Sequence, residues 1–321
     1  MTKIITAFTV TLFFTIVVNF SFAAFNDIGV GARPLGLGGA FVAVADDGNA
    51  PRYNAGGLGY IDDVHISLMY AQHFSGLIDY NYVGAVLPLS IVGSLGASFG
   101  QLEEDSDIYK ERTITLSYSK KLANPLAAGI NFKLLNIGFD GDNEWVKENS
   151  EYFTTTSASA FTMDIGVMAK PITGLSIGLS AQNLIPADVN IGEDLPDENR
   201  ETVPTNFRVG MAYNLSSIAA SAQQEALRDV LALTQGMIEA SFRNGEREIH
   251  IGAEAWIQKV LGVRAGYAAK SGVHSSSSFA IGASIKIPVT ESTLQFDYAF
   301  QVLVGELESK AAHRVSTNII F

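Results

Sequence analysis

The sequence predicts an all-β protein, a transmembrane antiparallel β-barrel of about 14 strands with an N-terminal hatch or plug segment in its lumen. The first observation is an alternation of apolar and polar residues with period two, from about residue 64 to the end of the chain, which places successive side chains on opposite faces of a strand. The second is the length of these segments. The third is the succession of short and long connections between them. These observations divide the chain into residues 1–23, 24–63 and 64–321.

Residues 1–23 have the three zones of a secretory signal peptide. A lysine near the start precedes an apolar run from Ile4 to Val18, and small residues follow up to Ala23. The apolar run is shorter than the roughly 20 residues that a membrane-spanning helix needs. We therefore expect export of the chain and cleavage after Ala23.

Residues 24–63, which we call the N-terminal segment, are not strand-like and are predicted to form the hatch. A short helix is expected from Ala40 to Ala45, whereas the remainder is rich in glycine and prone to turns. The glycines do not indicate a dinucleotide site, because such a loop follows a strand and opens a helix within a βαβ unit. No βαβ unit is expected anywhere in this chain.

Residues 64–321 are predicted to form the barrel. The alternating stretches have roughly 9 to 13 residues, the length that a tilted strand needs to cross a hydrocarbon core. A soluble β-sandwich or a lipocalin-like barrel would show the same alternation, but this length favours the membrane. The predicted strands are 64–73, 78–88, 91–101, 111–121, 126–138, 158–169, 173–184, 205–214, 229–242, 247–257, 260–270, 278–288, 292–301 and 313–321.

The connections alternate in length, as do the periplasmic turns and external loops of outer-membrane barrels. Short connections are expected at 88–90, 122–125, 171–173, 258–259 and 289–291. Longer polar loops are expected at 102–110, 139–157, 185–204 and 302–312. This order places both termini of the chain on the periplasmic side and predicts a location in the bacterial outer membrane.

Two connections depart from this order. Asn244-Gly245 is a tight hairpin signal on the external side, and residues 216–228 are long for a periplasmic turn. Near the end of this connection several residues have helical spacing, namely Leu227, Val230, Leu231 and Thr234. A helix here would alter the predicted strand 229–242 and with it the strand count.

The two faces of the strands predict what lies outside and inside the barrel. The outward row of one strand is Leu294, Phe296, Tyr298 and Phe300, and the chain ends in Phe321, which fits an outer-membrane assembly signal. The polar face carries glycine on seven strands: Gly129, Gly166, Gly178, Gly210, Gly252, Gly266 and Gly282. Strand-interior glycine marks a bend or the close approach of another backbone. These glycines therefore either leave room for a segment inside the barrel or ease its curvature.

The polar face also carries charges of both signs. In an open pore these groups would be solvated, whereas around a plug they would hydrogen-bond it in place. The predicted lumen-facing residues are Asp79, Asn81, Asn131, Lys133, Asp164, Gln182, Arg208, Asn214, Glu254, Arg264, Gln295, Asp297, Arg314 and Asn318.

Charge and composition exclude several classes of function. The formal charge is −12, with 33 acidic and 21 basic residues, and a nucleic-acid partner would need clustered Lys and Arg. Cysteine is absent, which excludes disulfides and thiolate metal sites. The histidines at 65, 73, 250, 274 and 313 lack metal-ligand spacing. We therefore expect no metal, no cofactor and no nucleic-acid partner.

Candidate catalytic groups have simpler explanations. Ser67 with His65, and Ser316 with His313, are expected to be polar-phase or rim residues rather than a nucleophile and its base. Adjacent carboxylates such as Asp46-Asp47 and Asp62-Asp63 are expected to be solvated, with calcium binding as an alternative only in the external loops. We expect that the protein is not an enzyme.

The N-terminal segment contains three distinctive strings: Gly-Ala-Arg-Pro, the run at 38–47, and an Asn-Pro-Ala-Gly-Leu-like string in which this chain has Ala55 for the proline and Gly56 for the alanine. In these strings the segment resembles the opening of the FadL-like outer-membrane transporters, most closely the PorV/PorQ (UPF0164-type) branch. This likeness implies a fourteen-stranded barrel with a luminal hatch. The hatch motif residues are Arg33, Pro34, Gly38, Gly39, Asp46, Asp47, Asn54, Gly56 and Gly57.

The resemblance implies two functions. FadL-type members carry long-chain fatty-acid-like or aromatic compounds passively along an apolar route beside the hatch, whereas PorV-like relatives are non-transporting components of protein secretion or envelope organisation. An apolar cavity reached from Trp145 or the 185–204 loop would favour uptake, and a sealed polar lumen would favour secretion. The expected partners are outer-membrane lipid and either a hydrophobic ligand or secretion-system proteins. A plain diffusion porin fits less well with a filled lumen.

Overall fold

The computed structural model describes residues 24–73, 76–104, 106, 108–149, 155–191, 202–219, 221–272, 275–305 and 310–321. The predicted signal peptide, His274 and parts of the longer predicted loops lie outside the described residues. In the described part of the chain, no helix is long and apolar enough to cross a membrane.

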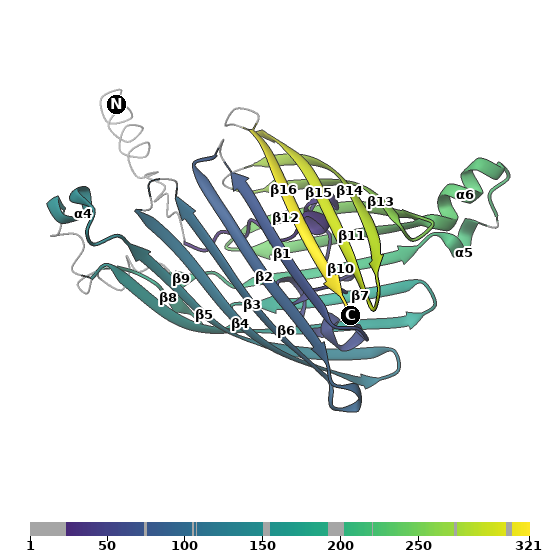
Figure 1. The fold of residues 1–321 in the computed structure, drawn as a ribbon, viewed down its shortest axis with the longest axis horizontal. Helices are drawn as coiled ribbons and strands as arrows, with labels where there is room; N and C mark the ends of the chain where they lie inside the picture. Colours follow the sequence, from purple (N-terminus) through teal and green to yellow (C-terminus); the bar gives the residue numbers. More distant parts are fainter. Residues whose placement is uncertain are drawn as a thin grey trace, which may run out of the picture.

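Fourteen antiparallel strands form a closed barrel (Figure 1), which confirms the predicted fold class. Pairing follows chain order, except that β7 pairs with β10 and β1 closes the barrel on β16. Two short strands, β8 (Ala187–Asp188) and β9 (Thr202–Val203), form a separate hairpin in the predicted 185–204 loop. The barrel strands are β1 His65–His73, β2 Ile78–Pro88, β3 Ser94–Glu104, β4 Tyr109–Ala123, β5 Leu126–Phe139, β6 Ser157–Ile172, β7 Leu175–Gln182, β10 Asn206–Asn214, β11 Thr234–Arg243, β12 Glu246–Ile257, β13 Leu261–Ser271, β14 Ser276–Val289, β15 Ser292–Gly305 and β16 Lys310–Ile320.

Side chains alternate between the two faces of the wall. In β15, Phe296 and Tyr298 are exposed on the outside, whereas Gln295 and Asp297 are buried. Rows of exposed aliphatic and aromatic residues continue around the other strands, as a lipid-facing wall requires. The barrel is therefore apolar outside and polar inside, the reverse of a soluble lipocalin-like barrel.

The two ends of the barrel differ. β1 begins where β16 ends, since His65 pairs with Ile320. At this end, which we call the turn end, five connections have two to five residues each: 89–93, which includes η3 (Ser90–Val92), 124–125, 173–174, 258–260 and 290–291. At the opposite end, which we call the loop end, two connections are long, 140–156 with α4 (Glu144–Glu148) and 183–205. The other five have two to four residues, so the predicted long loops 102–110 and 302–312 are wrong in length, because the flanking strands extend into them.

The predicted strand 229–242 is wrong at its start. Residues Glu225–Leu233 form helix α6, which follows the short helix α5 (Ser216–Ala219), and β11 begins at Thr234. From Thr234 onward β11 pairs with both β10 and β12. The connection is therefore helix plus strand, and the strand count stays at fourteen.

Two predicted lumen-facing residues do not face the lumen. Asn81 is exposed on the outward phase of β2, and Asp79 shares that phase and bonds the exposed Tyr70 hydroxyl. Asn214 keeps the inward phase of β10 but is exposed at the end of that strand. In β2 the buried inward positions are Tyr82, Gly84 and Val86. Polarity alone gave the wrong phase for Asp79 and Asn81 because the inward phase of β2 carries aromatic and apolar residues.

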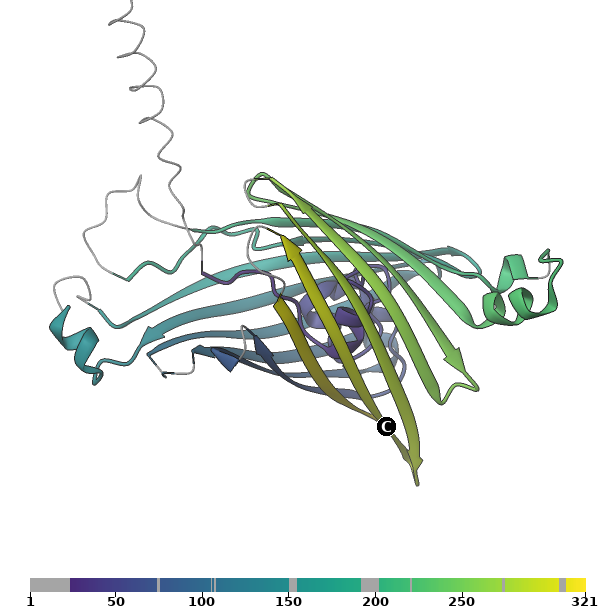
Figure 2. The ribbon, with the colours of Figure 1, turned by 90° about the horizontal axis from the view of Figure 1, so that it is seen from above.

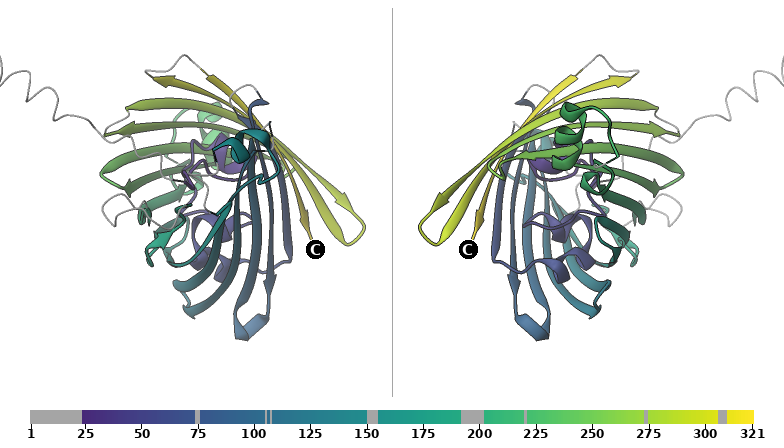
Figure 3. Two further views of the ribbon diagram at one scale, coloured as in Figure 1. Left: turned by 90° about the vertical axis from the view of Figure 1, so that its left-hand side faces the viewer. Right: turned by 90° about the vertical axis from the view of Figure 1, so that its right-hand side faces the viewer.

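The N-terminal segment runs inside the barrel, where Figures 2 and 3 show it as the purple chain enclosed by the strands. It contains α2 (Ala32–Gly36), α3 (Ala50–Tyr53) and the 3-10 helix η1 (Ala55–Tyr60). Phe41, Tyr53 and Leu58 are buried in the core that this segment forms with the wall.

The expected helix from Ala40 to Ala45 is wrong, since residues 42–44 form turns. The backbone N–H groups of Phe41 and Val42 both donate to the carboxylate of Glu239 at 2.8 Å. Asn54 Nδ2 donates to the carbonyl of Val42 at 2.8 Å. Within this stretch the N–H groups of Val44 and Ala45 both donate to the carbonyl of Phe41, so it forms a turn that side chains from elsewhere in the chain hold in place.

Candidate functional site

The candidate site is the barrel interior, where the N-terminal segment meets the inward side chains. On one side the Tyr82 hydroxyl donates to the carbonyl of Gly48 at 3.2 Å, and on another Asn131 Nδ2 donates to the carbonyl of Pro51 at 2.8 Å. Through hydrogen bonds and close packing together, the segment contacts each of the fourteen barrel strands. It therefore spans the lumen from wall to wall.

All seven glycines predicted on the polar face lie against this segment. A Cβ at Gly252 would stand 2.6 Å from the carbonyl oxygen of Leu37, and one at Gly266 would overlap the backbone of Leu37 and Gly38. The close approach of the segment accounts for these glycines. The others meet it in the same way: Gly129 faces Ala55, Gly166 faces Asn54, Gly178 and Gly210 face Val42, and Gly282 faces Gly36.

A first ion-pair cluster lies around Arg33 of α2. Arg33 Nε and Nη2 each donate to a carboxylate oxygen of Glu254 at 2.9 Å, a bidentate pair. Arg264 Nε donates to the same carboxylate at 2.5 Å, and its Nη1 lies 3.3 Å from Asp297 Oδ1. All four side chains are buried. Two arginines thus neutralise two wall carboxylates and attach α2 to the wall.

The acidic pair of the hatch motif completes this cluster. Arg33 Nη1 donates to Asp46 Oδ1 at 2.5 Å and to Asp47 Oδ2 at 3.1 Å. Asp47 is buried, and its Oδ1 accepts the backbone N–H of Asn49 at 2.8 Å. The expectation that Asp46 and Asp47 are both solvated is therefore wrong for Asp47, because Arg33 and a local turn compensate its burial.

A second cluster lies around Asp27 and Arg208. Asp27 accepts from Arg52 Nη2 at 2.8 Å and from Arg208 Nη1 at 3.4 Å. Burial alone would raise the pKa of Asp27, but the positive charges of Arg52, Arg208 and Arg243 hold that pKa well below its usual range. Arg208 also donates to Glu239 at 2.6 Å.

A third cluster attaches α3 and η1. Lys133 Nζ lies 2.6 Å from Asp164 Oδ1, and Asp164 Oδ2 accepts from Asn131 Nδ2 at 2.9 Å. Asn54 caps η1, since its Oδ1 accepts the backbone N–H of Gly56 at 2.9 Å, and its Nδ2 reaches the wall carbonyl of Val167 at 3.0 Å.

The remaining motif residues allow the backbone of the N-terminal segment to turn and to pack closely. Gly38 and Gly39 have φ of 63° and 87°, the left-handed region that favours glycine. The carbonyl of Gly38 lies 2.7 Å from His250 Nδ1. Pro34 is buried within α2, and a Cβ at Gly57 would overlap the carbonyl of Ala45. The motif therefore determines the compact conformation of the N-terminal segment and does not form a reactive centre.

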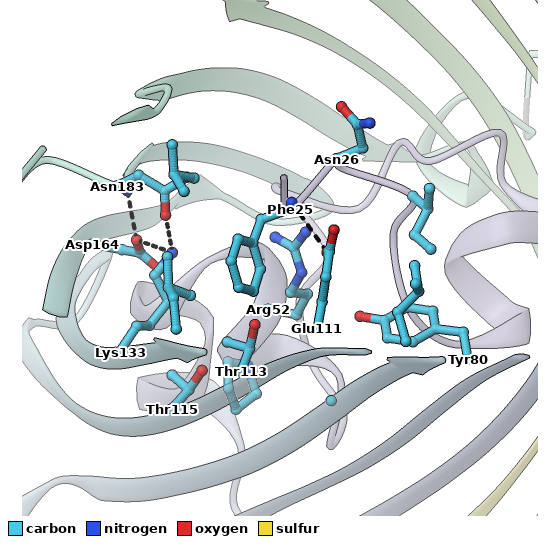
Figure 4. A pocket seen from close by; sticks show the side chains of 16 residues that line it. Phe25, Asn26, Arg52, Tyr80, Glu111, Thr113, Thr115, Lys133, Asp164 and Asn183 are labelled. Atoms are coloured by element: carbon cyan, nitrogen blue, oxygen red, sulfur yellow. Dashed lines mark hydrogen bonds and ion pairs between the residues drawn. The ribbon is translucent and has the colours of Figure 1, made fainter. Parts of the chain in front are cut away.

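A pocket lies between the segment and the wall (Figure 4). Its lining includes apolar side chains, but polar and charged side chains also point into the pocket. The Glu111 carboxylate accepts the backbone N–H of Phe25 at 3.1 Å. Trp145 is exposed on α4 and is not among the residues that form this pocket. The lining residues are Phe25, Asn26, Ile28, Pro51, Arg52, Tyr80, Gly100, Leu102, Glu111, Thr113, Thr115, Lys133, Leu135, Asp164, Asn183 and Val203.

The site residues predicted from the sequence do not include Asp27 and Glu239, which the structure places among the central ion pairs of the lumen. Glu239 belongs to the strand whose start was misplaced. Its alternation with Met237 and Ser241, all buried and inward, was the signal that would have identified it. Asp27 precedes the motif and has no signal in the sequence alone, because its arginine partners lie far along the chain.

Comparisons with known proteins give a family and a fold. Residues 53–318 match the family model described as "Type IX secretion system membrane protein PorP/SprF". No curated protein matches the chain. The finer likeness to the PorV/PorQ branch stays a prediction.

Solved structures of FadL-type channels share the fold. The "CymD monoaromatic hydrocarbon channel" is 11% identical with a TM-score of 0.62, and the match covers 92% of this chain and 98% of that chain. A Pseudomonas aeruginosa FadL homologue is 10% identical with a TM-score of 0.60, covering 91% and 98%. The P. putida toluene transporter TodX is 11% identical with a TM-score of 0.55, covering 91% and 98%. At these identities the likeness shows the fold alone.

Proposed function

Because the chain belongs to the PorP/SprF family of type IX secretion system membrane proteins, we propose that it is a non-transporting outer-membrane component of protein secretion. Its barrel anchors the protein in the outer membrane, and its partners are lipid and other secretion-system proteins. Within this role, the PorV-like resemblance of the N-terminal segment suggests a scaffold or shuttle component.

The observation that carries this proposal is the filled, ion-paired lumen. The N-terminal segment touches every strand and is attached to the wall through Arg33, Asp27 and Asn54. A hydrophobic molecule crossing this interior would have to separate buried charges, and an unpaired buried charge is costly. The interior therefore supports a barrel used as an anchor rather than as a route.

The pocket supports the same proposal. Ligand pockets for hydrophobic molecules are lined mainly by apolar and aromatic side chains. Here Arg52, Glu111, Lys133 and Asp164 all reach the pocket. An apolar ligand would leave these groups without water, so the pocket is poorly suited to a fatty acid or an aromatic hydrocarbon.

Passive uptake of hydrophobic compounds is the second candidate. It is supported by the fold that the chain shares with structures described as a hydrocarbon channel and a toluene transporter, and by Phe25, Ile28 and Leu135 on the apolar side of the pocket. Under this alternative the N-terminal segment would move to open an apolar route.

Purification from native outer membranes in mild detergent separates the two functions. We expect secretion-system proteins to co-purify, and mass spectrometry of the same sample to find no hydrophobic molecule at stoichiometric amount. A FadL-type channel taken through the same procedure is the control, because it should retain its ligand. A stoichiometric hydrophobe bound to this chain, with no partner protein, would contradict the secretion role.

A further inference from the structure

The connection between β10 and β11 is unlike the others at the turn end. It runs over residues 215–233 and contains α5 and α6, whereas the other connections at this end have two to five residues. Figure 1 shows both helices projecting from the turn end, outside the barrel wall. Joining two adjacent antiparallel strands needs no helix, so this connection has another role.

Helix α6 is amphipathic, and its apolar face is uncovered. Leu227, Val230 and Leu233 are spaced by three residues and therefore share one side of the helix. Their exposed fractions are 47%, 59% and 45%. Glu225 and Asp229 belong to the polar side. Three exposed aliphatic side chains on a nine-residue helix are costly in water.

The position of α6 connects this face with the lipid-facing wall. The helix contacts β11 and β12. The outward side chains of this part of the wall are apolar too, with Ile238 of β11, Ile257 of β12 and Leu261 of β13 all exposed. The apolar surface of α6 therefore continues the surface by which the barrel meets lipid.

We propose that α5 and α6 lie in the membrane interface at the turn end, with Leu227, Val230 and Leu233 inserted among the upper acyl chains. The polar side, with Glu225, Arg228 and Asp229, then faces the headgroups and water, as in interfacial helices. Because both ends of the connection are tethered to membrane-spanning strands, the helix needs little further binding energy to stay there. The occupant of this surface is phospholipid. The helix fixes the depth of the barrel beside β11 and β12, whichever function the barrel serves.

The absence of cysteine from the chain makes a direct test straightforward. Single-cysteine variants Val230→Cys on the apolar side and Asp229→Cys on the polar side, about 100° apart around α6, are labelled with an environment-sensitive fluorophore and reconstituted into phosphatidylethanolamine/phosphatidylglycerol vesicles. We expect the Val230→Cys probe to be quenched by acyl-chain nitroxide lipids, and by aqueous iodide roughly threefold less than the Asp229→Cys probe. Heat-modifiable electrophoretic mobility shows that each labelled barrel is folded.

Equal iodide quenching of the two probes, with no quenching by nitroxide lipids, would overturn the proposal. So would a Val230→Cys probe that is exposed in vesicles of purified protein and protected only in native membranes, because a protein partner would then cover the face. A Leu227→Ser, Val230→Ser, Leu233→Ser variant tests the same point separately: a probe at Ala226→Cys in that background should lose its nitroxide quenching. Unchanged quenching there would also contradict insertion.

Discussion

At the residue scale, the inward glycines are the tightest constraint on the site. Gly266 has no room for a side chain, because the backbone of Leu37 and Gly38 occupies the position that its Cβ would take. A methyl group there must move either the wall or the N-terminal segment. Neither moves easily, since α2 is held by the buried Arg33 pair with Glu254.

We therefore expect Gly266→Ala to destabilise the folded barrel by about 1–3 kcal/mol, the usual cost of overpacking. The measurement is the shift of the unfolding midpoint in denaturant, followed by tryptophan fluorescence. Gly236→Ala in β11 is the matched control, since an added Cβ there meets no atom within 4 Å. Equal midpoints for the two variants would show that the segment does not pack against Gly266.

The carboxylate of Glu254 receives two arginines, so Glu254→Gln is expected to leave buried positive charge without a partner. The expected loss is about 3–5 kcal/mol, since removing one member of a buried pair is strongly destabilising. Asp142→Asn is the control, because Asp142 pairs with Lys147 at 3.3 Å on the surface and exposed pairs contribute about 0–1 kcal/mol. Denaturant midpoints measure both, and a Glu254→Gln protein as stable as the control would contradict the role of this cluster.

At the scale of the element, Asp27 holds the start of the N-terminal segment through Arg52 and Arg208. A carboxylate whose folded pKa is lowered stabilises the fold at pH values above its unfolded pKa, and this stabilisation is lost as the pH falls through the folded pKa. The pKa of Asp27 lies well below the ordinary pKa of an aspartate, so the loss begins only in acid.

We therefore expect the Asp27 contribution to the docking of the segment to be constant between pH 7 and about 5 and to fall only in stronger acid. Hydrogen exchange of residues 26–31, compared between the native chain and Asp27→Asn, measures this contribution as a difference. The native chain should exchange more slowly, by the same factor at both pH values. A difference that vanishes near pH 5 would contradict the lowered pKa.

At the scale of the whole molecule, the lumen is occupied rather than open. The chain is thus expected to show no ion-conducting steps in planar bilayers. A variant lacking residues 26–61 should conduct if its barrel folds, since the inward charges would then line a water-filled channel. Heat-modifiable mobility identifies folded variant protein. Steady conductance of the intact chain at the level of that variant would contradict a filled lumen.

The barrel itself was predictable because its signals are local. Period-two alternation in stretches such as Leu294 to Phe300 is a property of neighbouring residues, and closure of the hydrogen-bond network does not alter it. The errors arose where another part of the molecule supplied the deciding contact. Residues 40–45 form a turn instead of the expected helix, and Glu239, nearly two hundred residues away, binds its backbone.

The sequence by itself determined the membrane-type barrel, its strand number and the presence of a glycine-rich segment before it, because each depends on residues close together in the chain. Only the tertiary structure decided how that segment meets the wall. Closure of the barrel brings Arg33 to Glu254, 221 positions apart, and Asp27 to Arg208, 181 positions apart. Burial makes such pairings strong, and no local pattern encodes which charges meet.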